Sequence, residues 1–405
     1  MQVDTLFERA KLPDGKLATI AVAHGRIAAI EDDSAKLLPA AAHVDHVDLA
    51  GALVIPGLVD GHIHLDTSFI GDNWKPHRAC SAGFNVLERI QFQKELLATA
   101  RPMIDRARAL IELCISRGTT HMRGHVNVDA AVGMTPFETI LAVREEYRDV
   151  VDIQLAAFPQ NGVIACPGTT ELLDTAVANG CDVIGGIDPA TIDRDIEGHL
   201  DVVFGIAERR GVDVDIHLHE PHMLGVFQLE QIASRTRALG MQGHVAVSHA
   251  YGLGEVSLDI ARRTAATLAA SGVPIMTNAP GNHPFPPVAE LTKAGVVVFS
   301  GNDNIRDSWW PYGDGDMLGR AMIVGYRSGF YTDDELAIAL DLATGNGAKV
   351  LRLPDYGIAV GAAADFVALA VEHIQEAVVS PAANRSVYKG GRLVAQNGTL
   401  VSRAS

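Results

Sequence analysis

The sequence predicts an α/β protein: a (β/α)8 barrel of the TIM type with a small β-sandwich domain formed by both chain termini. Three observations support this prediction. Eight short apolar segments alternate with helical segments through the middle of the chain. Both ends are rich in β signals, whereas the middle is not. The 405 residues exceed a typical single domain but fit a barrel of about 250 residues with additional elements.

The barrel strands are expected where apolar runs are bounded by Gly, Asp, Asn or Pro. In chain order they are residues 57–65, 120–126, 152–159, 182–188, 212–220, 244–250, 273–279 and 296–303. Residues 171–180 and 201–211 show helical spacing, and each segment ends at a glycine. A doubly wound sheet is the competing architecture, but it gives no reason for polar residues to gather at so many strand ends.

The two ends of the chain resemble each other in composition. Residues 17–31 and 386–401 both carry short apolar segments that are interrupted by glycine turns. We expect the ends to pair into one sheet domain made of residues 1–55 and 356–405. Residues 56–355 would then form the barrel.

Charge and composition exclude several function classes. The chain has 33 Lys and Arg against 49 Asp and Glu, a net charge of −16, whereas nucleic-acid binding needs a basic surface. No apolar stretch reaches the roughly 18 residues of a membrane span, so we expect no membrane contact. The start of the chain lacks a signal-peptide pattern, and the four cysteines form no C-x-x-C pair. We therefore expect a cytoplasmic protein.

Histidines and one aspartate stand at the ends of several predicted strands. His62 and His64 share one face of the first strand, since side chains two residues apart point to the same side. His217, His249 and Asp303 lie near the ends of the fifth, sixth and eighth strands. In a barrel these ends face one mouth. Imidazoles with a carboxylate suit Zn²⁺ or Fe²⁺ better than Mg²⁺ or Ca²⁺, so a metal site is predicted there.

Six longer segments carry specific motifs. They are PGLVDGHIHLDTS (56–68), DIQLAAFPQNG (152–162), GGIDPAT (185–191), DIHLHE (215–220), SHAYG (248–252) and SGNDNIRDSWWPYGDGDML (300–318). Together they resemble the amidohydrolase superfamily, in the branch of cytosine deaminase and N-isopropylammelide amidohydrolase, over nearly the whole chain. The resemblance implies a hydrolase acting on carbon–nitrogen bonds in cyclic amidines. It also implies that His62, His64, His217 and Asp303 bind the metal.

The number of metal ions is predicted from a missing residue. Members of this superfamily with two ions need a Lys or a Glu that bridges the ions from the fourth or a nearby strand. No lysine occurs between Lys94 and Lys293, and residues 182–188 contain neither Lys nor Glu. We therefore expect one divalent ion per subunit, Zn or Fe.

The resemblance also implies three catalytic residues. A divalent ion lowers the pKa of bound water towards 7, and Asp303 would take the first proton. Glu220 would protonate the ring nitrogen and then the leaving amine. The alternative for Glu220 is a charged residue at a helix start. His249 would hydrogen-bond the attacking hydroxide, and its alternative is a core histidine.

Four further residues are expected to contact the substrate, by the same resemblance. Gln160 carries an amide, which can donate and accept together and so matches a lactam edge. Asn304 and Trp309 fall where the family places substrate-lining residues, although Trp309 could equally serve in packing. His219 corresponds to a position that the branch uses near the substrate.

The motifs do not agree on one substrate. Thr67, Gln160 and Glu220 side with cytosine deaminase, whereas Asn304 and the short loop 279–287 depart from it. We expect a deaminase that replaces an exocyclic amine of a small nitrogen heterocycle by oxygen and releases ammonia. The alternative is release of an alkylamine from a triazine ring. A third interpretation is an inactive scaffold. The expected partner is a small molecule, and we also expect a homo-oligomer.

Overall fold

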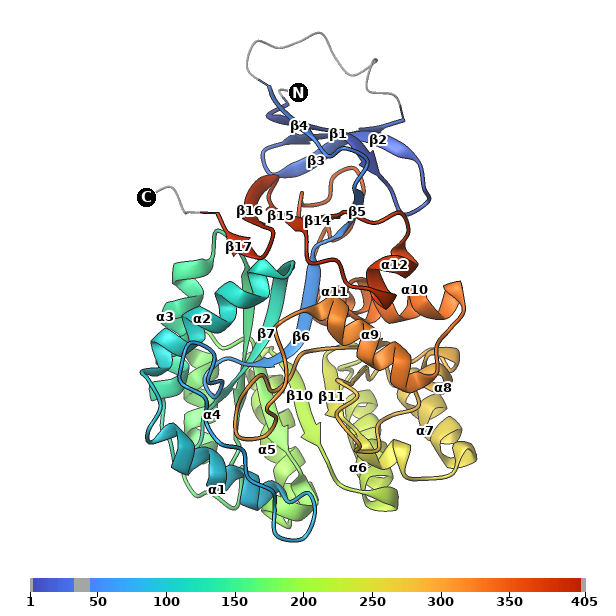
Figure 1. Ribbon diagram of the computed structural model, residues 1–405. Coiled ribbons are helices and arrows are strands. Elements are labelled where there is room, and N and C mark those ends of the chain that lie inside the picture. The colour runs from blue at the N-terminus through green and yellow to red at the C-terminus, as the bar shows by residue number, and fades with distance from the viewer. Residues whose placement is uncertain (1–2, 33–43, 402–405) are drawn as a thin grey trace.

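The structure, a computed structural model, describes residues 3–32 and 44–401. Its middle is an eight-stranded parallel barrel surrounded by helices (Figure 1), and this confirms the predicted architecture. The strands are β6 (Leu58–His64), β7 (Thr119–Asn127), β8 (Asp152–Phe158), β9 (Val183–Ile187), β10 (Asp213–Leu218), β11 (Val245–His249), β12 (Ile275–Met276) and β13 (Val298–Phe299). They pair in chain order from β6 to β13. Residues 1–2, 33–43 and 402–405 of the expected terminal domain lie outside the described residues.

The barrel closes where β6 meets the segment that follows β13. Ile63 and Asp303 form a parallel bridge. The Asp303 N–H donates to the His62 carbonyl at 2.7 Å, and the Gly61 N–H donates to the Ser300 carbonyl at 3.0 Å. Closure therefore places two histidines of β6 next to the aspartate that follows β13.

The last two barrel strands are shorter than the sequence predicts. Residues 273–279 and 296–303 were expected to be extended, but only two residues of each form regular strand. Ala279 and Asp303 adopt left-handed backbone conformations, with φ of 45° and 59°. Both residues lie beyond the end of the regular strand and turn the chain at the mouth of the barrel.

Helices cover the outside of the barrel and connect its strands. They are α1 (Val86–Leu97), α2 (Met103–Ser116), α3 (Thr135–Tyr147), α4 (Thr169–Ala178), α5 (Ile196–Arg210), α6 (His222–Ala238), α7 (Leu258–Ala270), α8 (Val288–Lys293), α9 (Met317–Ser328), α10 (Asp333–Leu342) and α11 (Gly345–Val350). The two helical segments predicted from the sequence correspond to α4 and α5. Helix α5 begins where the Asp195 side chain accepts from the Gly198 N–H and ends at Gly211, with a φ of 69°.

The two chain ends form one sheet of nine strands above the barrel (Figure 1). The strands are β1 (Thr5–Lys11), β2 (Leu17–Ala23), β3 (Arg26–Glu31), β4 (Asp45–Asp48), β5 (Leu53–Pro56), β14 (Phe366–Leu369), β15 (Arg385–Lys389), β16 (Arg392–Gln396) and β17 (Thr399–Leu400). β5 pairs antiparallel with β14 and so joins the two ends. The rings of Phe7 in β1 and Tyr388 in β15 lie 4.9 Å apart, although two strands separate them in the sheet. The sheet therefore curves around a core of its own. The short helix α12 (Ile374–Val379) connects β14 to β15.

A cluster of charges connects the terminal sheet to the barrel. Lys389 donates to Asp152 and Asp365, both at 2.6 Å, and its Nζ lies 3.3 Å from Nε2 of His121. His121 and Asp152 lie near the amino ends of their strands. The terminal sheet thus covers the base of the barrel and leaves the carboxyl ends of the strands for a functional site.

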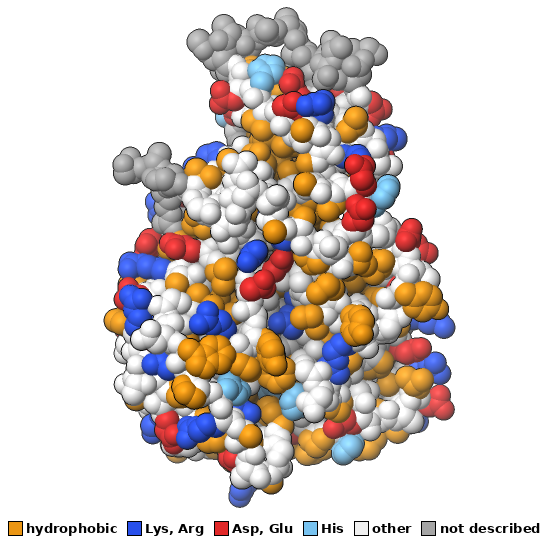
Figure 2. Space-filling view, viewed as in Figure 1, with side chains coloured by type: hydrophobic (Ala, Val, Ile, Leu, Met, Phe, Trp, Pro, Cys, Tyr) orange, Lys and Arg blue, Asp and Glu red, His pale blue; other side chains and the backbone are white. Residues whose placement is uncertain are grey.

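Acidic and basic side chains are interspersed over the face shown in Figure 2, without a large patch of one sign. Within residues 3–32 and 44–401, no helix combines the length and the apolar character that crossing a bilayer requires.

Candidate metal and active site

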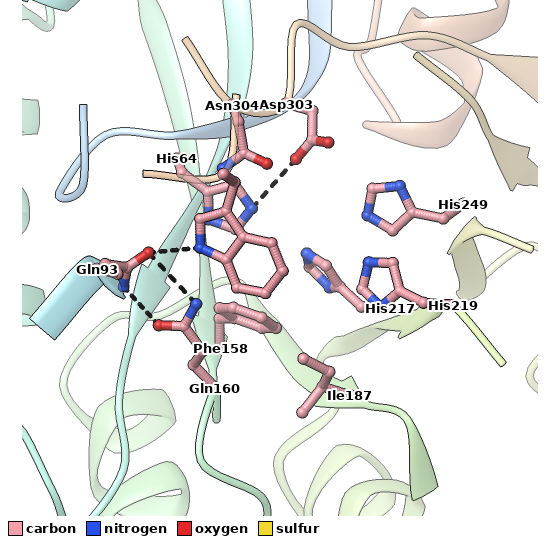
Figure 3. Close-up of a pocket in the computed structure, with 11 residues that line it drawn as sticks. His64, Gln93, Phe158, Gln160, Ile187, His217, His219, His249, Asp303 and Asn304 are labelled. Carbon is pink, nitrogen blue, oxygen red and sulfur yellow. Dashed lines mark hydrogen bonds and ion pairs between the residues drawn. The ribbon is translucent and has the colours of Figure 1, made fainter. Parts of the chain in front are cut away.

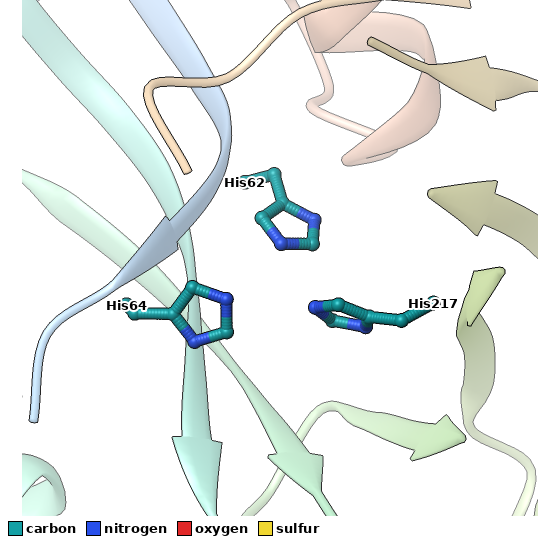
Figure 4. A group of neighbouring side chains, drawn as sticks. All are labelled: His62, His64 and His217. Carbon is teal, nitrogen blue, oxygen red and sulfur yellow. The ribbon is translucent and has the colours of Figure 1, made fainter. Parts of the chain in front are cut away.

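The four expected metal ligands come together at the carboxyl ends of the barrel strands. His62 and His64 lie on β6, His217 lies on β10, and Asp303 follows β13; all four are buried. One ring nitrogen from each histidine lies within 4.8 Å of the other two, and Figure 4 shows the rings around a common space. Oδ1 of Asp303 lies 3.4 Å from Nε2 of His64 and 3.6 Å from Nε2 of His62.

The donor atoms of this cluster suit a divalent cation. Among the described residues, Nε2 of His62 and both ring nitrogens of His217 are buried and have no hydrogen-bond partner. A buried polar atom without a partner costs free energy, and a bound cation would supply that partner. Three imidazoles and one carboxylate are ligands that zinc and iron accept. The residues therefore fit the expected metal.

A hydrogen-bond chain behind His62 orients its ring. The Ser248 hydroxyl donates to Oδ1 of Asp215 at 2.7 Å, so it accepts from Nδ1 of His62 at 2.9 Å. Arg123 donates to Oδ2 of Asp215 at 3.0 Å and fixes that carboxylate in turn. With the proton on Nδ1, Nε2 of His62 directs a lone pair into the ligand space.

Asp303 is also held in one orientation. Asn278 donates to its Oδ2 at 2.7 Å, so Oδ1 is the oxygen that faces His62 and His64. Burial alone would raise the pKa of Asp303, but His249 and His64 keep this pKa below its ordinary value. Asp303 is therefore a carboxylate at neutral pH. Both Asp303 and His249 adopt left-handed backbone conformations, a strain that clusters at functional sites.

Three imidazoles in this region, those of His62, His217 and His249, are held in the neutral form, whereas burial of His64 is outweighed by the Asp303 carboxylate, which raises the pKa of His64. Burial, and then repulsion from His125, lower the pKa of His62 and of His217 well below the ordinary value. Burial and the neighbouring His219 lower the pKa of His249 to about 3. Neutral imidazole is the form that binds metal ions, and it can also accept a proton.

Glu220 follows β10 and is only 2% exposed. Its Oε1 accepts from the N–H groups of Ala190 and Thr191, both at 3.0 Å, in the short helix Pro189–Asp193. In the part of the chain that the structure describes, its Oε2 has no partner. Burial, and then the negative charge of Asp188, raise the pKa of Glu220 to about 9. Glu220 therefore carries a proton at neutral pH and can donate it.

A cavity of about 290 Å³ opens onto the metal cluster (Figure 3). It is lined by His64, Gln93, Phe158, Gln160, Ile187, His217, His219, His249, Asp303, Asn304 and Trp309. All four residues expected to contact the substrate are among them. Aromatic and aliphatic side chains with a few convergent polar groups are typical of a small-molecule site.

A larger hollow of about 920 Å³, the outer groove, shares His219 with this cavity. It is lined by Phe84, Asn85, Val86, Leu87, Asp188, Thr191, His219, Glu220, Pro221, Tyr251, Glu255, His283 and Pro284. Of the three expected catalytic residues, His249 and Asp303 line the cavity, whereas Glu220 lines the groove. His219 therefore stands at the junction of the two spaces.

Sequence reasoning missed several residues of this region. Asp188 and Ser248 lie inside recognised motifs, so their position was a signal that could have identified them. Gln93 had no such signal, because nothing in its local sequence connects it with strands that follow much later in the chain. The ring of His125 stacks on that of His62, with 3.8 Å between the centroids.

Comparisons with known proteins match the chain to one enzyme family. Residues 45–395 match the sequence model of a family described as the amidohydrolase family. The chain is 32% identical over 365 residues to N-isopropylammelide isopropyl amidohydrolase of a Pseudomonas species (strain ADP), covering 88% of this chain and 90% of that protein.

Two solved structures are similar over almost their whole length. The N-isopropylammelide isopropylaminohydrolase of Burkholderia multivorans is 38% identical, with a TM-score of 0.93, and the match covers 99% of this chain and 100% of that one. The 5-methylcytosine deaminase of Klebsiella pneumoniae, bound to 5-fluorocytosine, is 29% identical, with a TM-score of 0.84, and the match covers 99% of each chain.

Proposed function

Because this chain belongs to the amidohydrolase family, we propose that it hydrolyses the bond between a small nitrogen heterocycle and an exocyclic amino group, releasing ammonia. The family resemblance read from the sequence motifs is thereby confirmed. One observation carries the proposal: a cavity lined by amides, imidazoles and an indole lies beside a histidine and aspartate cluster and adjoins, at His219, a groove lined by a protonated glutamate.

We propose that His62, His64, His217 and Asp303 hold one divalent ion, zinc or iron. The buried nitrogens without partners support this ligand set. The absence of lysine from residues 95–292 supports a single ion. Such an ion supplies a Lewis acid that lowers the pKa of water, so that a nucleophile is available at neutral pH.

The protein's own residues then move the protons. Asp303, a carboxylate at neutral pH, accepts the first proton from the attacking water. Glu220 donates its proton to the ring nitrogen beside the attacked carbon, and then a proton reaches the amine, which leaves as ammonia. Neutral His249 hydrogen-bonds the attacking oxygen. Each turnover consumes one water and replaces a carbon–nitrogen bond by a carbon–oxygen bond.

The cavity residues hold the ring. Gln160 and Asn304 offer amide donors and acceptors to its edge, His219 borders the leaving group, and Trp309 lies against its face. The exchange of a carbonyl and an N–H on the ring would leave buried polar atoms unpaired. Such a site discriminates strongly between related rings.

Release of an alkylamine is the second candidate. The outer groove is bordered by Phe84, Val86 and Leu87, and it lies beside Glu220, where a leaving amine would depart. An apolar substituent on that amine would find apolar contacts there. Two of the similar proteins bear names that state removal of an isopropylamine group from N-isopropylammelide.

The test measures ammonia release from cytosine, isoguanine, pterin, creatinine and ammeline, each beside its N-isopropyl analogue. Ammonia from an amino-substituted ring supports the leading proposal. Alkylamine release with no ammonia release supports the second candidate. Hydrolysis of none of these rings by the metal-loaded protein favours the inactive scaffold. The cytoplasmic location and the homo-oligomer stay predictions.

A further inference from the structure

Helix α1 contributes a single buried residue to the mouth of the barrel, and that residue is polar. All twelve residues of α1 are described, and only Gln93 is buried. Val86 and Ile90 pack against a small cluster formed by Phe158, Ile187 and Ile192. Val86, Ile90 and Gln93 are spaced four and three residues apart, so they share one face of the helix. The helix therefore presents Gln93 to the cavity while its other faces remain outside.

Gln93 connects two of the residues that line the cavity. Its Oε1 accepts from Nε1 of Trp309 at 2.7 Å, and its Nε2 donates to Oε1 of Gln160 at 2.6 Å (Figure 3). Nε2 of Gln160 returns a longer hydrogen bond of 3.4 Å to Oε1 of Gln93. The two side-chain amides thus pair edge to edge, 67 residues apart in the sequence.

The direction of these hydrogen bonds follows from chemistry. The indole N–H only donates, so the atom of Gln93 that faces Trp309 must be the oxygen. The nitrogen of Gln93 is then directed to Gln160, and it requires an oxygen there. One donor-only group therefore determines the orientation of two amides in succession, although an isolated amide could turn over freely.

We propose that Gln93 is a positioning residue for substrate specificity: it fixes which end of the Gln160 amide presents an acceptor and which presents a donor to the substrate. The proposal rests on the proposed function, because it concerns how the ring is read. It goes further by placing part of the specificity on α1, outside the barrel strands. Gln93 acts through Gln160 and Trp309.

A turned amide has a definite chemical consequence. A lactam edge offers a carbonyl oxygen and an N–H side by side, and it matches the Gln160 amide in one orientation only. In the other orientation acceptor faces acceptor and donor faces donor inside a buried site. Leaving buried groups unpaired costs more than a normal hydrogen bond contributes. The orientation of Gln160 therefore selects between two rings that exchange the carbonyl and the N–H on that edge.

Two substitutions separate positioning from simple packing. Gln93→Met keeps the length of the side chain but removes its hydrogen bonds to Trp309 and Gln160, which frees the Gln160 amide. Gln93→Glu keeps the acceptor for Trp309 and places a second oxygen where Nε2 of Gln93 faces Oε1 of Gln160. Because two oxygens repel each other there, the Gln160 amide should turn over and bring its Nε2 to that position. The matched control is Gln91→Met, because Gln91 lies on the same helix but is exposed and bonds only to Glu95.

The first measurement is kcat and KM on the ring that the wild-type protein hydrolyses best, and on the isomer that exchanges carbonyl and N–H. We expect Gln93→Met to raise KM about tenfold, the effect of one lost buried hydrogen bond, with kcat changed by less than about threefold. We expect Gln93→Glu to shift the preference towards the exchanged isomer. Gln91→Met should match the wild type in both quantities.

The second measurement does not need activity. Protein labelled with ¹⁵N in its three tryptophans gives one indole N–H signal for each, and Trp309→Phe assigns the relevant one. We expect Gln93→Met to move the Trp309 signal upfield, because its hydrogen bond is lost, and Gln93→Glu to keep it downfield. Gln93→Glu preserves the size of residue 93, so its isomer preference still tests the positioning role if Gln93→Met does not fold.

The outcomes distinguish this inference from the proposed function. A wild-type protein that hydrolyses no ring would contradict the proposed function, while the indole signals would still report whether Gln93 binds Trp309. An active wild type with unchanged KM and unchanged isomer preference in both Gln93 variants overturns the positioning role. An unmoved indole signal in Gln93→Met overturns it as well.

Discussion

Asp188 contacts His219 through both of its carboxylate oxygens: Oδ1 accepts the backbone N–H at 2.6 Å, and Oδ2 lies 2.8 Å from ring Nδ1. Burial alone would raise the pKa of Asp188, but His219 lowers it. Asp188 therefore stays charged, and its charge contributes to raising the pKa of Glu220 to about 9. One carboxylate thus orients His219 and keeps a second carboxyl group protonated.

The first prediction concerns the pH dependence that this charge creates. If Glu220 acts as the acid, its protonated form is active, so kcat/KM is constant below the pKa of Glu220 and falls above it. The wild type should lose activity near pH 9. Asp188→Asn removes the negative charge and lowers the pKa of Glu220, so the loss should begin at a lower pH. A pH profile of kcat/KM measures the shift.

The control for this profile is Asp174→Asn, which removes a carboxylate from the outer helix α4, where it pairs with Arg210. Its profile should coincide with that of the wild type. If Asp188→Asn loses activity at the same alkaline pH as the wild type, the charge of Asp188 does not control the acid.

The second prediction concerns Glu220 itself. Glu220→Gln keeps the side-chain volume and an oxygen for the Ala190 and Thr191 N–H groups, but removes the transferable proton. We expect kcat to fall by roughly 10²-fold or more, the usual effect of a positioned acid–base group. Metal content and thermal stability should stay close to those of the wild type. Glu230→Gln, on the exposed side of α6, is the control. Near wild-type turnover in Glu220→Gln would assign the proton transfer to another residue.

The third prediction concerns metal content. Elemental analysis of purified protein should find one zinc or iron ion per chain, and a chelator should remove both the ion and the activity. His217→Ala and Asp303→Asn should each lose the ion, because each removes one of four ligands. His46→Ala, an exposed histidine of the terminal sheet, should keep it. Two ions per active chain would contradict the single site, and an active protein without metal would contradict the mechanism.

The fourth prediction concerns stability at the base of the barrel. Lys389→Met leaves the buried Asp365 without its cation, which costs about 3–5 kcal/mol when a buried pair is broken. The urea concentration at the midpoint of unfolding should therefore fall. The kcat/KM of the folded protein should stay unchanged, because the candidate site lies at the opposite end of the strands. Lys16→Met removes an exposed lysine, 65% accessible, and should leave the midpoint unchanged. If the free energy of unfolding falls by less than about 1 kcal/mol, Asp365 must find another partner when Lys389 is removed.

The sequence predicted that the four expected metal ligands would come together, because their placement depends on few variables. Once His62, His217 and Asp303 are placed at strand ends, the barrel brings those ends to one mouth whatever the details of packing. The strand lengths were harder to predict. Regular pairing in β12 and β13 covers only Ile275–Met276 and Val298–Phe299, because it depends on the neighbouring strands rather than on local composition.

Gln93 could not be predicted for a different reason. Its burial depends on Gln160 and Trp309, which come from distant parts of the chain, and its own helix shows no strong apolar stripe to mark an inward face. A glutamine beside Lys94 and Glu95 is typical of a solvated helix face. Contacts of this kind are set by tertiary structure.

The fifth prediction concerns the leaving group. The cavity is lined by neutral amides from Gln160 and Asn304, which offer donors and acceptors but no charge to the ring. Thr67 is buried and its hydroxyl donates to Asp307, so this position brings no cation to the ring. A neutral ring with an unsubstituted NH₂ beside a ring nitrogen and a carbonyl should therefore be preferred.

Side-by-side kcat/KM values for the amino and isopropylamino forms of one ring measure this preference. We expect the amino form to be favoured at least about tenfold, because the extra carbons of the isopropyl group crowd a cavity whose polar groups match the ring. Leu87→Ala removes an apolar side chain of the outer groove, and it should then leave kcat/KM for both substrates nearly unchanged. A clear preference for the isopropyl form, reduced by Leu87→Ala, would instead identify the groove as the binding site of the alkyl group and establish the second candidate.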